Sequence, residues 1–162
     1  RILVISDTHG NEQGLLQAIE EQPSARAVIH LGDGAREAQA AADHFPGLPF
    51  YSVRGNCDWP SAAQNLLYAH EETFAGKRIF FTHGHLYEVK FDLYRAACAA
   101  REREADALLF GHTHRPVIDY TDDVIAVNPG SISYPRQEGH RPSFVMMELD
   151  RFGDAHFTIN YL

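Results

Sequence analysis

The sequence has little of three things that mark common classes of protein: cysteine, positive charge and long apolar runs. Its 162 residues include two cysteines, Cys57 and Cys98, which are too few for a disulfide framework and suit a reducing cytoplasm. Fourteen Lys and Arg against 22 Asp and Glu give a net charge of −8, which argues against binding an extended nucleic-acid backbone. No apolar run approaches the ~20 residues that span a bilayer, so no membrane segment is expected.

What the sequence has in excess is histidine together with carboxylate. Ten histidines accompany the 22 acidic residues, and imidazole and carboxylate together are a common set of metal ligands. With 44% hydrophobic and 22% charged residues, the chain is expected to fold as a globular protein rather than to be disordered or fibrous. Its length suits one domain and no repeat or linker divides it, so a single domain over residues 1–162 is predicted.

The first two thirds of the chain alternate short apolar runs with segments of helical periodicity. Each run is rich in β-branched or aromatic residues, which predicts a strand buried on both faces. The five runs are Ile2–Ile5, Ala27–Ile29, Phe50–Val53, Ile79–Phe81 and Leu108–Phe110. Between them, the spacing of apolar residues predicts helices near 15–19, 38–45 and 91–98.

The last third of the chain favours hairpins. Two pairs of apolar segments flank short polar turns, one at Thr121-Asp122-Asp123 and one at Arg151–Asp154. The flanking segments are Val117–Tyr120, Val124–Val127, Phe144–Leu149 and 157–161. The sequence therefore predicts an α/β fold in which a βαβα half joins a β-meander, packed as layers of sheet and helix.

Each of the five apolar runs is followed within a few residues by side chains that can bind a metal. In an open α/β sheet, ligands bind beyond the carboxyl ends of the strands, so these loops are expected to converge. In chain order they are Ser6-Asp7-Thr8-His9-Gly10-Asn11, His30-Leu31-Gly32-Asp33-Gly34, Arg54-Gly55-Asn56-Cys57-Asp58, Thr82-His83-Gly84-His85 and Gly111-His112-Thr113-His114. The side chains expected to meet are Asp7, His9, Asp33, Asn56, His83, His112 and His114.

The spacing within these segments suits chelation of a cation. In Asp7-Thr8-His9 and in His112-Thr113-His114, two ligands stand two residues apart, which places both side chains on one side of an extended segment. A carboxylate such as Asp33 can bridge two cations, and Asn56 offers a neutral oxygen that suits a hard or borderline divalent ion. The absence of a four-cysteine cluster argues against a structural zinc site. Each segment alone also fits an ordinary turn or helix cap, but the five together favour a metal centre.

The ordered set Asp-x-His, Gly-Asp, Gly-Asn, His-Gly-His and Gly-His-x-His resembles the calcineurin-like metallophosphoesterases. It is most similar to the small bacterial YfcE-type phosphodiesterases, which share the Gly-Asn-Cys-Asp, Thr-His-Gly-His and Asn-Pro-Gly-Ser segments. The resemblance runs from Ile2 past Ser131. It implies a four-layer αββα sandwich in which helices flank two mixed β-sheets.

The resemblance also implies two divalent metal ions that share one bridging carboxylate. The implied ligands are Asp7, His9, Asp33 and His114 for one ion, and Asp33, Asn56, His83 and His112 for the other, with Asp33 bridging. Manganese is the first choice, and iron, zinc, nickel and cobalt tolerate the same ligands. The implied reaction is hydrolysis of a small phosphodiester, in which a hydroxide that bridges the metals attacks phosphorus in line.

One position departs from the wider superfamily. Many members carry histidine directly after Gly-Asn, where it assists the leaving oxygen, and this chain has Cys57 there. A thiol is a weaker donor, and losing a general acid typically costs ~10²–10⁴-fold, so diesters or activated substrates are favoured over monoesters. His85 is the other candidate for this role, and a purely structural part for it stays open. The catalytic candidates are Asp33, Asn56, Cys57 and His85.

Further residues are candidates for substrate contact, and for each an ordinary surface or packing role is the alternative. They are Arg54, Arg115, Arg136 and Arg141 for phosphate, Trp59 and Tyr134 for stacking on a base, and Ser131 for substrate or a metal-bound water. Ser131 belongs to a predicted rigid turn, Asn128-Pro129-Gly130-Ser131.

Three functions therefore compete. A phosphodiesterase is favoured, a phosphomonoesterase differs from it in substrate, and a protein-binding scaffold would resemble the retromer subunit of this fold. That subunit departs from the catalytic set at the Asp-x-His position and after Gly-Asn, so His9 favours catalysis while Cys57 leaves room for the scaffold. A protease pair of Cys57 and His83 is disfavoured because no oxyanion site accompanies it. The physiological diester stays open, and the late strands offer a surface for a homo-oligomer.

Overall fold

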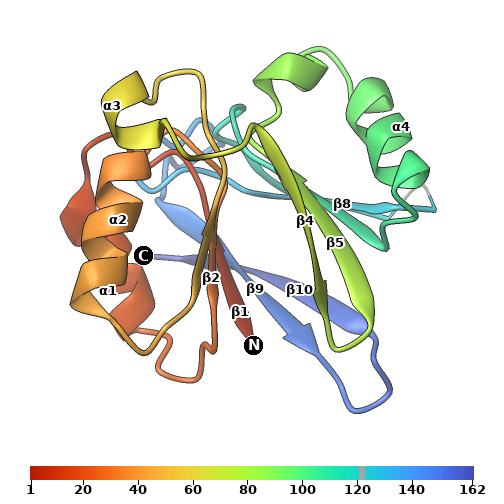
Figure 1. The fold of residues 1–162 in the computed structure, drawn as a ribbon, viewed down its shortest axis with the longest axis horizontal. Coiled ribbons are helices and arrows are strands. Elements are labelled where there is room, and N and C mark those ends of the chain that lie inside the picture. The colour runs from red at the N-terminus through yellow and green to blue at the C-terminus, as the bar shows by residue number, and fades with distance from the viewer. Residues whose placement is uncertain (121–122) are drawn as a thin grey trace.

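The computed structural model describes residues 1–120 and 123–162, which form two five-stranded β-sheets flanked by helices (Figure 1). The first sheet has the order β10-β9-β1-β2-β3, with β1 (Ile2–Ile5), β2 (Val28–His30), β3 (Phe50–Ser52), β9 (Ser143–Leu149) and β10 (Ala155–Tyr161). The second has the order β4-β5-β6-β8-β7, with β4 (Ala69–Phe74), β5 (Lys77–Thr82), β6 (Ala107–Phe110), β7 (Pro116–Asp119) and β8 (Ile125–Pro129). The predicted α/β class, with two mixed sheets between helices, is confirmed.

Helices cover the outer face of each sheet. The covering helices are α1 (Glu12–Glu20) and α2 (Ala35–His44) on the first sheet and α4 (Tyr94–Glu102) on the second, while the short α3 (Pro60–Ala63) and the 3-10 helix η1 (His85–Tyr87) lie in the connections. Helix α1 begins at Asn11, whose side-chain oxygen accepts a hydrogen bond from the Gly14 N–H at 2.9 Å. Helices α2 and α4 turn mainly alanines toward the sheets, and such short side chains let a helix lie close to its sheet. In the described part of the chain, no helix is long and apolar enough to cross a membrane.

Alternation along the central strands produces the four layers. In β1, Val4 packs into a core between the two sheets, while Leu3 and Ile5 pack on the opposite face toward α1 and α2. In β5, Phe81 enters the same central core, while Phe80 packs toward α4. Because neighbouring residues of a strand point to opposite faces, a strand buried on both faces separates two cores. Figure 1 shows the result, with α1 and α2 outside one sheet and α4 outside the other.

The prediction that the last third of the chain forms a single β-meander is wrong. Strands β9 and β10 form the predicted antiparallel hairpin, but β9 also pairs antiparallel with β1 in the first sheet. Strands β7 and β8 also pair antiparallel, and β8 pairs in parallel with β6 in the second sheet. The two hairpins separate because β1 and β6 each leave an edge whose backbone groups need partners. Thr121 and Asp122 of the predicted turn lie outside the described residues.

Strand β4 was not expected from the sequence. Its residues, Ala-His-Glu-Glu-Thr-Phe, are mostly polar, and they pair antiparallel with β5 at the edge of the second sheet. An edge strand with one exposed face can carry charge, and it lacks the apolar run that marks an inner strand.

Candidate metal centre

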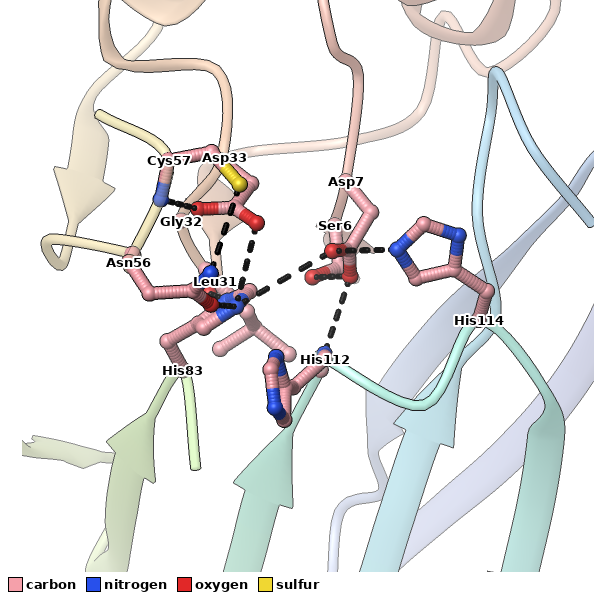
Figure 2. Close-up of polar contacts among 12 residues, drawn as sticks. Ser6, Asp7, Leu31, Gly32, Asp33, Asn56, Cys57, His83, His112 and His114 are labelled. Atoms are coloured by element: carbon pink, nitrogen blue, oxygen red, sulfur yellow. Dashed lines mark hydrogen bonds and ion pairs between the residues drawn. The ribbon is translucent and has the colours of Figure 1, made fainter. Parts of the chain in front are cut away.

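The loops that follow β1, β2, β5 and β6 meet across the boundary between the two sheets. In the first sheet, the Asp7 N–H donates to the Gly32 carbonyl at 3.0 Å, and in the second, the Gly111 N–H donates to the His83 carbonyl at 3.1 Å. The two sheets are joined by the His112 N–H, which donates to Oδ2 of Asp7 at 3.0 Å. The predicted convergence of strand-end loops is therefore present, with ligands contributed by both sheets (Figure 2).

The loop backbone differs from the extended geometry expected for the two-residue spacings. Five of the seven predicted ligands have positive φ, at Asp7 (55°), His9 (37°), Asp33 (56°), His112 (66°) and His114 (59°). Residues other than glycine rarely adopt this left-handed backbone region. The resulting backbone strain, of about 1–3 kcal/mol per residue, tends to persist at functional sites. The expectation that ligands two residues apart leave an extended segment is thus wrong, because the loops turn sharply at the ligands themselves.

Two glycines make room for the carboxylates. A Cβ atom at Gly55 would overlap the Asp33 carboxylate, and one at Gly111 would overlap the Ser6 hydroxyl. That hydroxyl donates to Oδ2 of Asp7 at 2.6 Å. The glycines beside the predicted ligands therefore allow close approach of one loop to the next.

Asp7 holds a buried oxygen that no hydrogen bond satisfies. Its Oδ2 accepts from Ser6 and from the His112 N–H, whereas Oδ1 is buried and accepts no hydrogen bond from any described residue. Three imidazole nitrogens surround Oδ1: Nε2 of His114 at 3.0 Å, of His9 at 3.6 Å and of His83 at 4.0 Å. A fully buried carboxylate oxygen without a donor is costly unless a cation compensates it.

The tautomer of His83 adds a second unsatisfied group. Its Nδ1 lies 2.7 Å from the Leu31 carbonyl, which can only accept, so Nδ1 carries the hydrogen. In the neutral ring, Nε2 then presents a lone pair toward Oδ1 of Asn56 at 3.0 Å and Oδ2 of Asp33 at 3.3 Å. All three atoms are acceptors, so a cation belongs among them.

His114 repeats this arrangement on the other side of Asp7. Its Nδ1 donates to the Tyr134 carbonyl at 2.8 Å, so Nε2 faces Oδ1 of Asp7 at 3.0 Å and Nε2 of His9 at 3.3 Å. A carbonyl that fixes the tautomer of a histidine is a common support for metal ligation. The residues present therefore fit divalent metal ions, on the evidence of their bare acceptors rather than of composition.

The buried carboxylates and the imidazoles around them shift one another's pKa values. The Asp7 carboxylate, 3.6 Å from Nε2 of His9, raises the pKa of His9, and the pKa of His83 is raised because the Asp33 carboxylate outweighs the effect of burial. Burial also opposes ionisation of the two aspartates, but the imidazoles outweigh it: the pKa of Asp7 falls far below its usual range and that of Asp33 falls to about 2. Both carboxylates are thus charged and ready to bind a cation.

His112 stands at the edge of the cluster. Three groups of side chains bring ligand atoms close enough to share an ion: Asp7, His9 and His114; Asp7, Asp33 and His83; and His9, Asp33 and Cys57. The ring of His112 joins none of them among the described residues, although its centroid lies 5.0 Å from that of His83. Burial and the charge of His83 lower the pKa of His112 to about 4, so its ring is neutral at physiological pH. The structure thus brings six of the seven predicted ligands together and places the ring of the seventh beside them.

Cys57 and His85, the two candidates for assisting the leaving group, lie in different environments. The Cys57 N–H donates to Oδ1 of Asp33 at 2.7 Å, and burial together with the Asp33 charge raises the pKa of the thiol to about 11. The His85 ring is 5.4 Å from that of His83, and burial followed by the His83 charge lowers its pKa. Its Nδ1 is buried and has no hydrogen-bond partner among the described residues.

Asp58 organises the site and was missed as a functional residue. Its Oδ2 accepts from the N–H groups of Asp33 (3.0 Å) and Gly55 (2.7 Å), and its Oδ1 from those of Gly34 and Ala35 (2.8 Å each). One carboxylate thereby fixes the loop that carries Asp33 and caps the N-terminus of α2. The signal in the sequence was its place directly after Gly-Asn-Cys, but four backbone partners from two loops are visible only in the fold.

The turn at Asn128–Ser131 borders the site, as the resemblance implied. The Ser131 hydroxyl donates to the Asp7 carbonyl at 2.8 Å and accepts from the Ser133 and Tyr134 N–H groups. Because Ser131 is fully buried and its oxygen is already engaged, the idea that it touches substrate is wrong. Its role is to hold the Asp7 loop against the segment that carries Tyr134.

The four arginines considered for phosphate do not form one cluster, and none of them lines the pocket beside the predicted ligands. Arg54 packs over the ring of Tyr68 at 5.3 Å, and Arg141 packs over Tyr161 at 4.9 Å. Arg115 and Arg136 line a pocket of about 540 Å³ formed with residues of the 89–93 segment, which includes none of the predicted ligands. Another pocket, of about 530 Å³, is bordered by the ligands His9 and Asp33 together with residues of α2 and α3 and with Trp59 and Tyr134.

Comparisons with known proteins agree with this geometry. A family model for the calcineurin-like phosphoesterase superfamily domain matches residues 1–151. The chain is 36% identical over 138 residues to the probable metallophosphoesterase YsnB of Bacillus subtilis, covering 83% of this chain and 76% of that protein. It is 29% identical over 171 residues to the phosphodiesterase YfcE of Escherichia coli K12, covering 93% and 88% of the two chains.

Solved structures share the fold over nearly the whole chain. A predicted phosphoesterase of Streptococcus pneumoniae TIGR4 superposes with a TM-score of 0.80 at 28% identity, covering 99% of this chain and 87% of that one. Vps29 of Entamoeba histolytica, solved in complex with zinc, superposes with a TM-score of 0.74 at 21% identity, covering 99% and 98%. At that identity, the likeness to Vps29 concerns the fold alone.

Proposed function

This chain belongs to the calcineurin-like phosphoesterase superfamily, and we propose that within it the protein is a metal-dependent phosphodiesterase acting on small diesters. The observation that carries the proposal is Oδ1 of Asp7, a buried carboxylate oxygen without a hydrogen bond that faces the Nε2 atoms of three histidines. A site built only for protein binding gains nothing from a strained, charged cluster of this kind. The name of the relative YfcE supports the choice of diesters.

We assign two divalent metal ions to this site, with manganese as the first choice. One ion would be held by Asp7, His9, Asp33 and His114, and the other by Asp33, Asn56, His83 and His112. Asp33 would serve both ions: its Oδ2 lies 3.7 Å from Nε2 of His9 and 3.3 Å from Nε2 of His83, while its Oδ1 accepts from the Cys57 N–H. When bound, such ions supply positive charge for phosphate oxygens and lower the pKa of water.

The chain's own residues would orient the diester and manage the leaving oxygen. The Cys57 thiol, with its pKa near 11, stays protonated and could donate only a weak hydrogen bond. The neutral His85, with Nδ1 unsatisfied, is the alternative partner for that oxygen. Neither matches a positioned imidazolium, so we expect the protein to prefer diesters with good leaving groups over monoesters.

The test compares hydrolysis of bis(p-nitrophenyl) phosphate and p-nitrophenyl phosphate by protein loaded with manganese and by protein treated with chelator. We expect turnover that requires metal, is faster for the diester and falls by about 10³-fold or more in Asp33→Ala. The matched control is His156→Ala, which removes an imidazole from a surface Asp–His pair outside the site and should leave the rate unchanged. Absence of turnover in the metal-loaded protein would reject the proposal that the protein is an enzyme.

The competing function is a protein-binding scaffold, which the likeness in fold to Vps29 keeps in view. A scaffold would bind its partner without hydrolysing either ester, and Asp33→Ala would leave partner binding intact. The two functions therefore give opposite results in the same pair of assays.

A further inference from the structure

The pocket of about 530 Å³ beside the metal centre has features that neither metal binding nor packing explains. It is bordered on one side by His9 and Asp33 and on the other by the start of α2 and α3. Its volume falls in the usual range for small-molecule sites, about 300–1,000 Å³. A ligand in it would extend directly from a phosphate held at the metal ligands.

Two large aromatic side chains line this pocket with their rings exposed. Trp59, the only tryptophan of the chain, is 78% exposed, and Tyr134 is 59% exposed. Exposed rings at a pocket wall are the usual means of holding a flat ligand, because stacking needs a free face.

Tyr134 is fixed against the metal ligands. Its ring lies 5.4 Å from the His9 ring, its carbonyl accepts from Nδ1 of His114, and its N–H donates to the Ser131 hydroxyl at 2.8 Å. Trp59 is held from the other side, since it directly follows Asp58, whose carboxylate binds four backbone N–H groups. Both residues are thus anchored at their backbones while their side chains stay largely exposed.

The remaining lining residues distinguish a flat polar ligand from an acyl chain. Arg36 lines the pocket and makes no ion pair with any residue that the structure describes, so its guanidinium can donate to a ring or sugar oxygen. The carboxylates of Asp33, Glu37 and Asp58 also line the pocket, and each already accepts a backbone N–H, from Cys57, Gly10 and Asp33 respectively. An acyl chain would lie against these polar groups, whereas a ring with polar edges uses both the aromatic faces and the donors.

We propose that this pocket binds the ester arm of the substrate, and that this arm carries a planar aromatic ring that stacks on Trp59 and Tyr134. The ring is a nucleobase or an aryl group, and Arg36 donates to its polar edge or to the attached sugar. This inference rests on the proposed function, because it names the class of diester that the same site would hydrolyse. Trp59 and Tyr134 are then specificity residues rather than catalytic ones.

The experiment uses three phosphodiesters that share a methyl arm and differ in the other arm. They are the methyl esters of adenosine 5′-phosphate, of ribose 5-phosphate and of phenyl phosphate. Zinc-loaded protein is mixed with each, and quenching of tryptophan fluorescence, which reports on Trp59 alone, is recorded before turnover. KM and kcat for each diester are measured in parallel. Variants are Trp59→Ala, Tyr134→Ala and, as a matched control, Phe91→Ala, an exposed ring that borders none of the described pockets.

We expect the adenosine diester to quench Trp59 and to have a lower KM than the ribose diester. Loss of either ring should raise KM for the adenosine diester by about 5- to 100-fold, leave kcat within about 2-fold and leave the ribose diester and the Phe91→Ala control unchanged. A phenyl diester that matches the adenosine diester would support stacking of any aryl arm, and one that matches the ribose diester would identify a nucleobase.

Equal KM values for the adenosine and ribose diesters without quenching would overturn the inference, as would an equal loss for both diesters in the ring variants. Failure of the proposed function looks different. In that case no diester turns over, yet quenching by the adenosine diester that is lost in Tyr134→Ala still shows the aromatic site.

Discussion

Two histidine–aspartate pairs in this molecule have almost the same geometry and opposite surroundings. Nε2 of His114 lies 3.0 Å from Oδ1 of Asp7, and Nε2 of His156 lies 2.9 Å from Oδ2 of Asp150. The first pair is almost fully buried at the meeting point of the two sheets, whereas His156 and Asp150 lie at the exposed β9–β10 turn. Distance alone does not distinguish a metal centre from a surface ion pair.

What distinguishes the pairs is how many other acceptors crowd the same atom. Oδ2 of Asp150 has one imidazole partner and access to water, and the other oxygen accepts from the Phe152 and Asp154 N–H groups as in an ordinary turn. Oδ1 of Asp7 has two further imidazoles within 4.0 Å and accepts no hydrogen bond from the described residues. Because these acceptors are buried and lack donors, they favour the binding of a cation.

The largest difference between the pairs should appear when each aspartate becomes asparagine. In Asp7→Asn, the amide loses the charge and brings an N–H₂ group among three imidazoles, so we expect diester hydrolysis to fall by about 10³-fold or more and metal binding to weaken. In Asp150→Asn, turnover should match the parent protein. Hydrolysis of bis(p-nitrophenyl) phosphate and metal content by elemental analysis are measured for both variants. An equal loss of activity in the two variants would show that burial does not distinguish the two pairs.

Asp58 tests whether the buried pair depends on its supporting loops. Asp58→Asn keeps one acceptor oxygen and loses the other, so two of the four backbone N–H groups lose their partner. We expect turnover to fall by about 10- to 100-fold and the free energy of unfolding to fall by about 1–3 kcal/mol. Urea denaturation and kinetics measure the two effects separately. Full activity in Asp58→Asn would show that Asp33 needs no such support.

Metal binding should release protons from the buried cluster and not from the surface pair. The raised pKa values of His9 and His83 favour protons on these rings in the metal-free protein, relative to an ordinary imidazole. A metal must displace those protons, so affinity should rise as the pH rises and level off above the raised pKa values. Calorimetry in two buffers of different ionisation enthalpy counts the protons. Asp150→Asn should release the same number, and binding without release would contradict the assignment.

The smallest effect should follow loss of the surface imidazole. His156→Ala should leave the melting temperature within about 2 °C, because exposed ion pairs contribute little to stability. The hydrogen bond from His156 lowers the pKa of Asp150, so this pKa should return toward its ordinary value in the variant. NMR titration of the Asp150 carboxyl measures the change in its pKa. A large fall in the melting temperature of His156→Ala would contradict the expectation that the exposed pair contributes little to stability.

Much of the site could be predicted because its ligands follow the ends of apolar strands. The runs before Asp7, Asp33 and His83 are continuous and buried on both faces, so the strands and the loops after them are visible in the sequence. The resemblance supplied what periodicity could not, namely the division into two sheets.

Other features depend on contacts between distant segments and leave no local pattern. The positive φ values of Asp7 and His114 arise from loops that must turn at their ligands, whereas the spacing alone suggested extended chain. The four bonds of Asp58 join two loops, and the polar strand β4 is recognisable only by its pairing with β5. The burial that makes Ser131 structural likewise follows from packing against the Asp7 loop.

The contact between His9 and His114 spans 105 positions of the chain, and it has a consequence for folding kinetics. Such a contact closes a long loop, so it forms only after both sheets are largely assembled. The metal centre is therefore absent from the early, partly ordered states through which the chain passes. A ligand that binds only this late contact slows unfolding and leaves the rate of folding almost unchanged. For this fold, metal loading would be a determinant of lifetime rather than of how fast the protein first folds.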